Sequence, residues 1–116
     1  MLFRSLLPDV SELDHKDRHP TGFLRPDGTP VEVYSSFSPG AVDCHFRWMR
    51  EYGIDGVFVQ RFVGPLAHPR HLRNCTLVLD HCRAAAVRHG RVFAVMYDLS
   101  GIQAGKAAAE IGRAHV

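Results

Sequence analysis

The sequence predicts an α/β fold in which helices alternate with parallel strands. Two short segments, residues 57–62 and 92–97, are nearly continuous runs of β-branched, aromatic and other apolar residues, which is typical of strands buried on both faces. Between them, apolar residues recur at helical spacing over residues 69–89. Two strands joined by a helical crossover form a right-handed βαβ unit, so we expect the strands to be parallel neighbours.

Residues 1–30 are rich in turn-forming residues and predict mostly irregular structure, with one short helical turn near residues 10–13. Asp27 and Gly28 lie between two apolar segments, and an Asp-Gly pair in that position is typical of a β-hairpin turn. We therefore expect a hairpin-like turn that leads into a short extended segment over residues 31–34.

A first helix is predicted to begin after Ser38, a favourable N-cap residue, with Pro39 at the first helical position. Gly53 follows this segment and can adopt the positive φ that ends many helices. The apolar residues in between have helical spacing and are expected to form the buried face: Val42, Phe46, Met49 and Tyr52.

A second helix is predicted over residues 69–89, where Gly90 follows the last turn. A loop over residues 98–101 then leads to a third helix over residues 102–109. The apolar stripe of the second helix steps by three and four residues and is expected to pack on one face of the strand pair: Leu72, Cys75, Leu79, Cys82 and Ala86.

Composition places the chain among ordinary globular proteins and excludes several functional classes. With 116 residues, 46% hydrophobic and 22% charged, it has room for one domain with a core. The net charge is +2, and basic residues are interleaved with acidic ones, so we expect no nucleic-acid partner. No apolar run approaches the ~20 residues of a membrane span, and the apolar patch near the N-terminus is too short for a signal peptide.

The residues that could bind metals favour structural roles. The three cysteines have spacings that fit no metal or redox motif, so we interpret them as small buried thiols. His68 and His71 have a spacing found in metal sites, but they lie at a helix start without a nearby third ligand, and we interpret them as solvated capping residues. His45 borders the buried face of the first helix and is expected to be a core or interface histidine. No metal and no cofactor are predicted.

Four polar residues mark the candidate site, since they lie where the two predicted strands end. In α/β folds, ligands bind beyond the carboxyl ends of parallel strands. Arg and Asp side chains there can hydrogen-bond a hydroxyl-rich ligand, and a tyrosine can stack on a sugar face. The alternative is that Arg61 and Asp98 only pair with each other or with loop backbone. The candidate substrate-binding residues are Gln60, Arg61, Tyr97 and Asp98.

Residues 33–37 and 42–62 resemble bacterial proteins related to glycoside hydrolase families 71 and 99, which are often labelled xylosidase or arabinosidase. Residues 8–13 and 96–101 fit the same group, and residues 45–62 are the most specific part. The resemblance covers nearly all of residues 8–105.

This resemblance implies a (β/α)8 barrel that cleaves or binds glycans without a metal. In that family, a pair of glutamates on a later strand-end motif performs acid/base catalysis with retention. The chain has no such motif, so the resemblance transfers only the four substrate-side positions named above. The glutamates of the chain are Glu12, Glu32, Glu51 and Glu110.

We therefore expect residues 1–109 to be the N-terminal part of a (β/α)8 barrel, which typically needs ~250 residues. Such a fragment of a glycosidase would be inactive alone. Its unpaired strand edges would also make it marginally stable or aggregation-prone.

The last seven residues, 110–116, are what GAG ATC GGA AGA GCA CAC GTC encodes, and nearly all of that string is a widely used sequencing-library adapter. We interpret them as an assembly scar and expect them to make no specific tertiary contacts.

Two alternatives to a hydrolase fragment remain open. One is a non-catalytic glycan-binding barrel on the same fold, which would lack the paired carboxylates in its later strands. The other is a small self-contained α/β interaction domain, which requires the last seven residues to be native.

Overall fold

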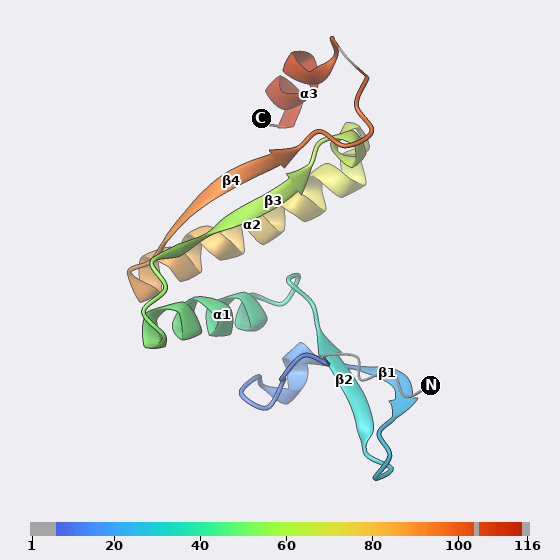
Figure 1. The fold of residues 1–116 in the computed structure, drawn as a ribbon, viewed down its shortest axis with the longest axis vertical. Coiled ribbons are helices and arrows are strands. Elements are labelled where there is room, and N and C mark those ends of the chain that lie inside the picture. The colour runs from blue at the N-terminus through green and yellow to red at the C-terminus, as the bar shows by residue number, and fades with distance from the viewer. Residues whose placement is uncertain (1–6, 104, 115–116) are drawn as a thin grey trace.

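The computed structural model describes residues 7–103 and 105–114, and from residue 39 onward its helices and strands alternate in the predicted order. Figure 1 shows helices α1 and α2 side by side, with the β3–β4 strand pair along α2 and the β1–β2 hairpin projecting beyond α1. The elements are the 3₁₀ helix η1 (His15–Asp17), strands β1 (Arg18–Leu24) and β2 (Pro30–Tyr34), helix α1 (Pro39–Glu51), strand β3 (Gly56–Phe62), the 3₁₀ helix η2 (Gly64–Ala67), helix α2 (Pro69–His89), strand β4 (Val92–Asp98) and helix α3 (Ala107–Ala114).

The N-terminal region contains an antiparallel hairpin, β1–β2, whose turn includes Gly28 at a φ of +82°. The predicted Asp-Gly turn is confirmed, but the expectation of irregular structure over residues 18–24 is wrong. Pairing with β2 overrides the turn-forming residues within β1, and the register is irregular between Pro20 and Leu24.

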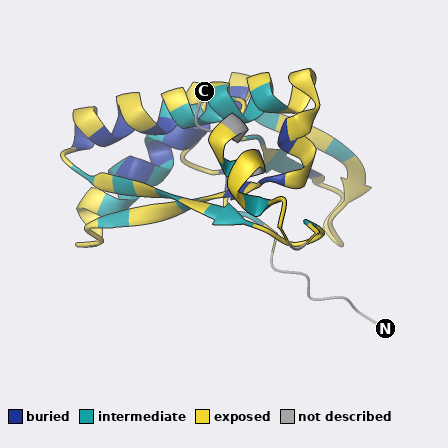
Figure 2. Ribbon diagram, turned by 90° about the horizontal axis from the view of Figure 1, so that it is seen from above, coloured by how far each residue is buried: buried dark blue, intermediate teal, exposed yellow. Residues whose placement is uncertain are grey.

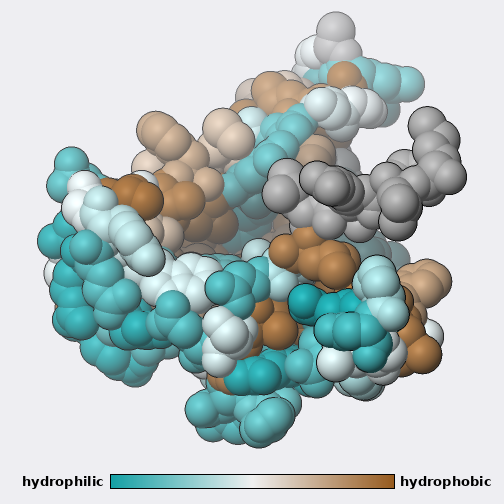
Figure 3. All heavy atoms as spheres, turned by 60° about the horizontal axis from the view of Figure 1, so that its bottom comes forward, coloured by the Kyte–Doolittle hydropathy of each residue, from teal (hydrophilic) through white to brown (hydrophobic). Residues whose placement is uncertain are grey.

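Hydrophilic residues cover most of the face that carries this end of the molecule, with hydrophobic residues among them (Figure 3).

Strands β3 and β4 form the predicted parallel pair, in register from Gly56 beside Val92 to Phe62 beside Asp98. This confirms an α/β arrangement in which a helix, α2, connects two parallel strands. The sheet has these two strands only, and no barrel is closed within residues 7–103 and 105–114.

One face of this sheet is covered by helices, whereas the other is exposed. Val59 and Phe93 pack against the α1–α2 core. Side chains alternate between faces along a strand, so Phe58 and Phe62 point the other way, and they are 72% and 52% exposed. The expectation of strands buried on both faces is therefore wrong for this chain, because no element within the described residues covers the second face (Figure 2).

The main core lies between α1, α2 and the sheet. Phe46 of α1, which is 2% exposed, packs with Val42 against α2. The small residues Ala85 and Ala86 let the two helices approach each other closely. Of the predicted stripe on α2, Cys82 and Ala86 are buried, and three residues are only half-buried: Leu72, Cys75 and Leu79.

The ends of both long helices follow the sequence prediction. Ser38 precedes α1, and Gly53 after it has a φ of +71°. Gly90 ends α2 in the left-handed conformation. Tyr52, predicted to face the core, is 76% exposed instead, because α1 ends at Glu51 and the chain turns away toward β3.

A polar contact joins the two helices beside this core. Asp43 of α1 accepts hydrogen bonds from Arg88 and, at 3.0 Å, from Nε2 of the buried His89, both on α2. A carboxylate shared by two basic side chains fixes the rotation of α1 relative to α2 more specifically than apolar packing does.

The N-terminal segment is attached to the opposite side of α1 by a second core and by Arg47. Val10 and Leu13 pack against three residues of α1: Ala41, Cys44 and Trp48. Residues 10–13 form the predicted turn, in which the Leu13 N–H donates to the carbonyl oxygen of Val10.

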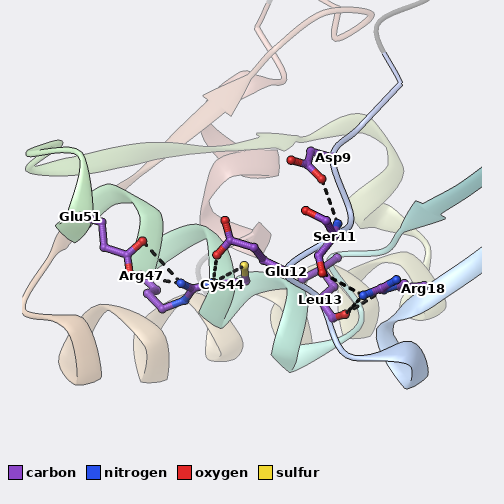
Figure 4. Close-up of polar contacts among 8 residues, drawn as sticks. All are labelled: Asp9, Ser11, Glu12, Leu13, Arg18, Cys44, Arg47 and Glu51. Atoms are coloured by element: carbon purple, nitrogen blue, oxygen red, sulfur yellow. Dashed lines mark hydrogen bonds and ion pairs between the residues drawn. The ribbon is translucent and has the colours of Figure 1, made fainter.

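Figure 4 shows the two arginines that hold the N-terminal segment, Arg47 to α1 and Arg18 to β1. Arg47 of α1 donates to Glu12 at 2.6 Å and to Glu51 at 3.1 Å. Arg18 of β1 donates to the carbonyl oxygens of Leu13 and Ser11. The Glu12 hydrogen bond raises the pKa of Arg47, while the same contact lowers the pKa of Glu12.

Helix α3 differs from the prediction of a helix over residues 102–109. It begins at Ala107 and continues to Ala114, into the seven-residue segment that resembles an adapter, and it lies against η2. Ile111 is half-buried and not locked into the core. Val116 lies outside the described residues, so the adapter origin of residues 110–116 stays a prediction.

The close approach of β3 and β4 at their first residue predicts a sensitive position. A Cβ at Gly56 would lie 2.0 Å from the backbone oxygen of Val92, so Gly56→Ala must push the two strands apart. We expect the free energy of unfolding to fall by about 1–3 kcal/mol, measured by urea denaturation. Gly112→Ala is the matched control, because a Cβ there meets no atom within 4 Å and should raise stability by about 0.5–1 kcal/mol. Equal stability of Gly56→Ala and wild type would contradict this reading of the sheet.

Candidate functional site

A pair of polar side chains lies on the open face at the carboxyl end of the parallel sheet. Gln60 of β3 donates from Nε2 to Oδ2 of Asp98 on β4 at 2.6 Å. Oδ1 of the same carboxylate accepts from the backbone N–H of Ser100 at 2.8 Å. Asp98 is therefore held between the neighbouring strand and the loop that follows its own strand.

Apolar side chains flank this pair on the same face. Met96 lies beside Gln60 in the parallel register, and Phe62 lies beside Asp98. Both apolar side chains are exposed, at 44% and 52%. The open face thus combines a fixed carboxylate and amide with an aromatic ring and a thioether.

Arg61 and Tyr97, the other two predicted residues, lie toward the same end of the sheet but on its helix-covered face. They are register neighbours, and each is one residue away from a member of the polar pair, so strand alternation turns them to the opposite side. Arg61 is 7% exposed and donates from Nη2 to Thr76 Oγ1 of α2 at 3.2 Å. The structure therefore brings Gln60 and Asp98 together but does not gather all four side chains into one cluster. An Arg61–Asp98 ion pair is not found.

A partly open pocket of about 170 Å³ lies beside Arg61 between β3, α2 and the loop before α1. Sequence reasoning did not predict it, because its walls come from three separate segments. The alternation of residues 57, 59 and 61 on the covered face was the one available signal that Arg61 points inward. The apolar residues of its lining are Phe37, Val59, Val78 and Leu79.

The carboxylate of Asp98 is suited to accepting hydrogen bonds. Hydrogen bonds from Ser100, followed by the one from Gln60, lower its pKa below the usual value of 3.8. It is therefore ionised at neutral pH and is a poor general acid. The glutamates at positions 12, 32 and 51 are each engaged in an ion pair with Arg47 or Arg18.

The histidines singled out in the sequence have structural roles. His68 is the N-cap of α2, where Nδ1 accepts from the Arg70 N–H at 3.2 Å, as the capping interpretation predicts. His45 lies between the rings of Tyr34 and Trp48, at centroid distances of 4.7 and 5.5 Å, and burial lowers its pKa.

The cysteines are free thiols, as predicted, although only Cys44 and Cys82 are buried and Cys75 is half-buried. Within the part of the chain that the structure describes, no group of three or more His, Cys, Asp or Glu residues is arranged to hold a metal ion.

Comparison with known proteins adds no relative: no family model, curated protein or solved structure matches this chain. Among the described helices, none combines the length and the apolar character needed to cross a membrane. The geometry of the open face and of the Arg61 pocket is therefore the basis for the functional argument.

The hydrogen bonds of Asp98 predict a low titration midpoint. In a carboxyl-carbon NMR titration, the pKa of Asp98 is expected to lie below 3.8, because the bonds from Ser100 favour the ionised form. Ser100→Ala removes the hydroxyl contact, the larger cause of the shift, and keeps the backbone N–H, so it should raise this pKa toward the usual value. Ser36→Ala, at an exposed turn, should leave the pKa unchanged. A wild-type midpoint at or above 3.8 would show that the Ser100 contact does not form in solution.

Proposed function

We propose that this chain forms the substrate-binding part of a glycoside hydrolase with a (β/α)8 barrel, and that Gln60 and Asp98 contact sugar hydroxyls. The parent protein would act on O-glycosidic bonds of a polysaccharide or oligosaccharide. The observation that carries this proposal is the Gln60–Asp98 hydrogen bond on the helix-free face at the carboxyl ends of two parallel strands. Arg61 and Tyr97 lie on the other face and are not part of it.

The position of the pair supports a ligand site. In (β/α)8 barrels the helices lie outside, so the helix-free face of the strands is the one that faces the barrel interior. Active sites of these barrels form at the carboxyl ends of the strands. Gln60 and Asp98 combine both conditions, since they lie on the helix-free face and close to the last residue of each strand.

The chemistry of the open face fits a sugar. An ionised carboxylate accepts charge-assisted hydrogen bonds from hydroxyl groups, and the Gln60 amide can both donate and accept. The exposed ring of Phe62 offers an apolar surface for the C–H face of a pyranose. A site for an anionic ligand would instead need a cationic side chain beside Asp98. The side chain there is the neutral amide of Gln60, so a neutral sugar fits better.

A non-catalytic glycan-binding barrel is the second candidate, and the hydrogen bonds and ion pairs of four carboxylates support it. Asp98 is held ionised, and Glu12, Glu32 and Glu51 are engaged with arginines, so none of these four is free to act as a general acid. The two candidates differ in whether the later strands of the parent protein carry a pair of carboxylates. They agree on the binding role of Gln60 and Asp98.

Titration of the whole chain with xylohexaose and with an arabino-oligosaccharide, followed by amide NMR shifts, tests the binding role. We expect shifts confined to residues near the ends of β3 and β4. Asp98→Ala should weaken binding by about tenfold, because a hydrogen bond to a charged group is lost.

Asp80→Ala is the matched control, since Asp80 is an exposed carboxylate on α2 that pairs with Arg83. It should bind both sugars as the wild type does, and the spectrum of each variant shows whether the fold is kept. Unchanged affinity in a folded Asp98→Ala chain, or shifts located elsewhere, would contradict the proposal and favour a self-contained interaction domain.

A further inference from the structure

The side chain of Arg61 is a buried cation without a matching anion. It is 7% exposed, its Nε is enclosed and has no hydrogen-bond partner, and its Nη2 donates to the neutral hydroxyl of Thr76. None of the ion pairs among the described residues includes Arg61. A guanidinium keeps its charge at any physiological pH, so burial without a counterion is unfavourable.

The pocket beside Arg61 is of a size to hold a small ligand. Its volume is about 170 Å³, and an apolar cavity of roughly 150 Å³ is known to hold a benzene ring. Its walls are mainly apolar, through Val59 of β3, Val78 and Leu79 of α2, and Phe37 from the loop before α1, and the polar residues Gln60 and Asn74 border it as well. The carbonyl of Phe37 contacts His81 Nε2 at 3.2 Å, which fastens this loop to α2.

From these two features we propose that the pocket binds a small organic carboxylate with an apolar, ring-sized body, whose carboxylate pairs with Arg61. The apolar walls take the body of the ligand, and the guanidinium supplies the charge. In the unliganded chain Nε is enclosed and Nη2 donates to Thr76, so the guanidinium must turn from Thr76 toward the pocket to reach the ligand's carboxylate. The 3.2 Å bond to Thr76 is at the long end of the hydrogen-bond range and is the contact given up.

This site is separate from the proposed glycan site. The pocket lies beside Arg61 on the helix-covered face of the sheet, and the Gln60–Asp98 hydrogen bond lies on the open face, although Gln60 also borders the pocket. A sugar acid carries hydroxyl groups that the apolar walls cannot satisfy, so the ligand chemistry of the two sites also differs. The inference therefore stands whether or not the chain binds glycans.

Calorimetric titration of the whole chain with three probes tests the proposal. Phenylacetate should bind, and phenylacetamide, which has the same shape without the charge, should bind at least about tenfold more weakly. Glucuronate, a carboxylate on a hydroxylated ring, should not bind detectably. Equal affinity for phenylacetate and phenylacetamide, or no binding of phenylacetate, would overturn the proposal.

A substitution and a labelling experiment locate the ligand. Arg61→Met should reduce phenylacetate binding to the level of phenylacetamide, whereas Arg73→Met, at an exposed arginine of α2, should bind phenylacetate as the wild type does.

Cys75 lines the pocket, so saturating phenylacetate should slow its alkylation by iodoacetamide in the wild type, read by peptide mass spectrometry. The same concentration of phenylacetamide is the control, and it should protect Cys75 less. Unprotected Cys75 at saturation would overturn the location even where Arg61→Met does not fold.

Discussion

Helix α1 is the element on which the rest of the structure depends, because it is buried on two sides. One side places Val42 and Phe46 against α2 and the sheet, and the other places Ala41 and Cys44 against the N-terminal segment. Among the described residues the two cores share no other helix, so α1 is the main packing link between the sheet and the hairpin region. The contact of Asp43 with Arg88 and His89 then fixes how α1 is turned against α2.

Local signals in the sequence were sufficient for α1, α2, β3 and β4 and for their ends. Ser38 and Gly53 bound α1, Gly90 ends α2, and the apolar runs mark β3 and β4 with their parallel pairing. These features depend on residues near each other in the chain. The strand β1 was not predictable in this way, since Pro20 and Gly22 disfavour it locally and its formation depends on pairing with β2.

The position of the candidate site was predictable, but the face of the sheet on which each side chain lies was not. The ends of β3 and β4 indicated where polar residues gather, and Gln60 and Asp98 do form a hydrogen bond there. An apolar run does not reveal which neighbours cover each face, so neither the exposure of Phe58 nor the inward orientation of Arg61 followed from it. The pocket beside Arg61 depends on Phe37, which is distant in sequence and is brought there by the packing of α1 on α2.

The single tryptophan of the chain, Trp48, lies where α1 meets the N-terminal segment, and its ring lies at a tilt to that of His45, with 5.5 Å between the ring centroids. An imidazolium quenches indole fluorescence far more strongly than a neutral imidazole does. Burial lowers the pKa of His45, so its ring stays neutral to a lower pH than an exposed imidazole does, and the quencher forms only under more acidic conditions. The emission of this chain is thus a local optical reporter of the junction between the hairpin region and α1, and it is silent about events at the far end of the sheet.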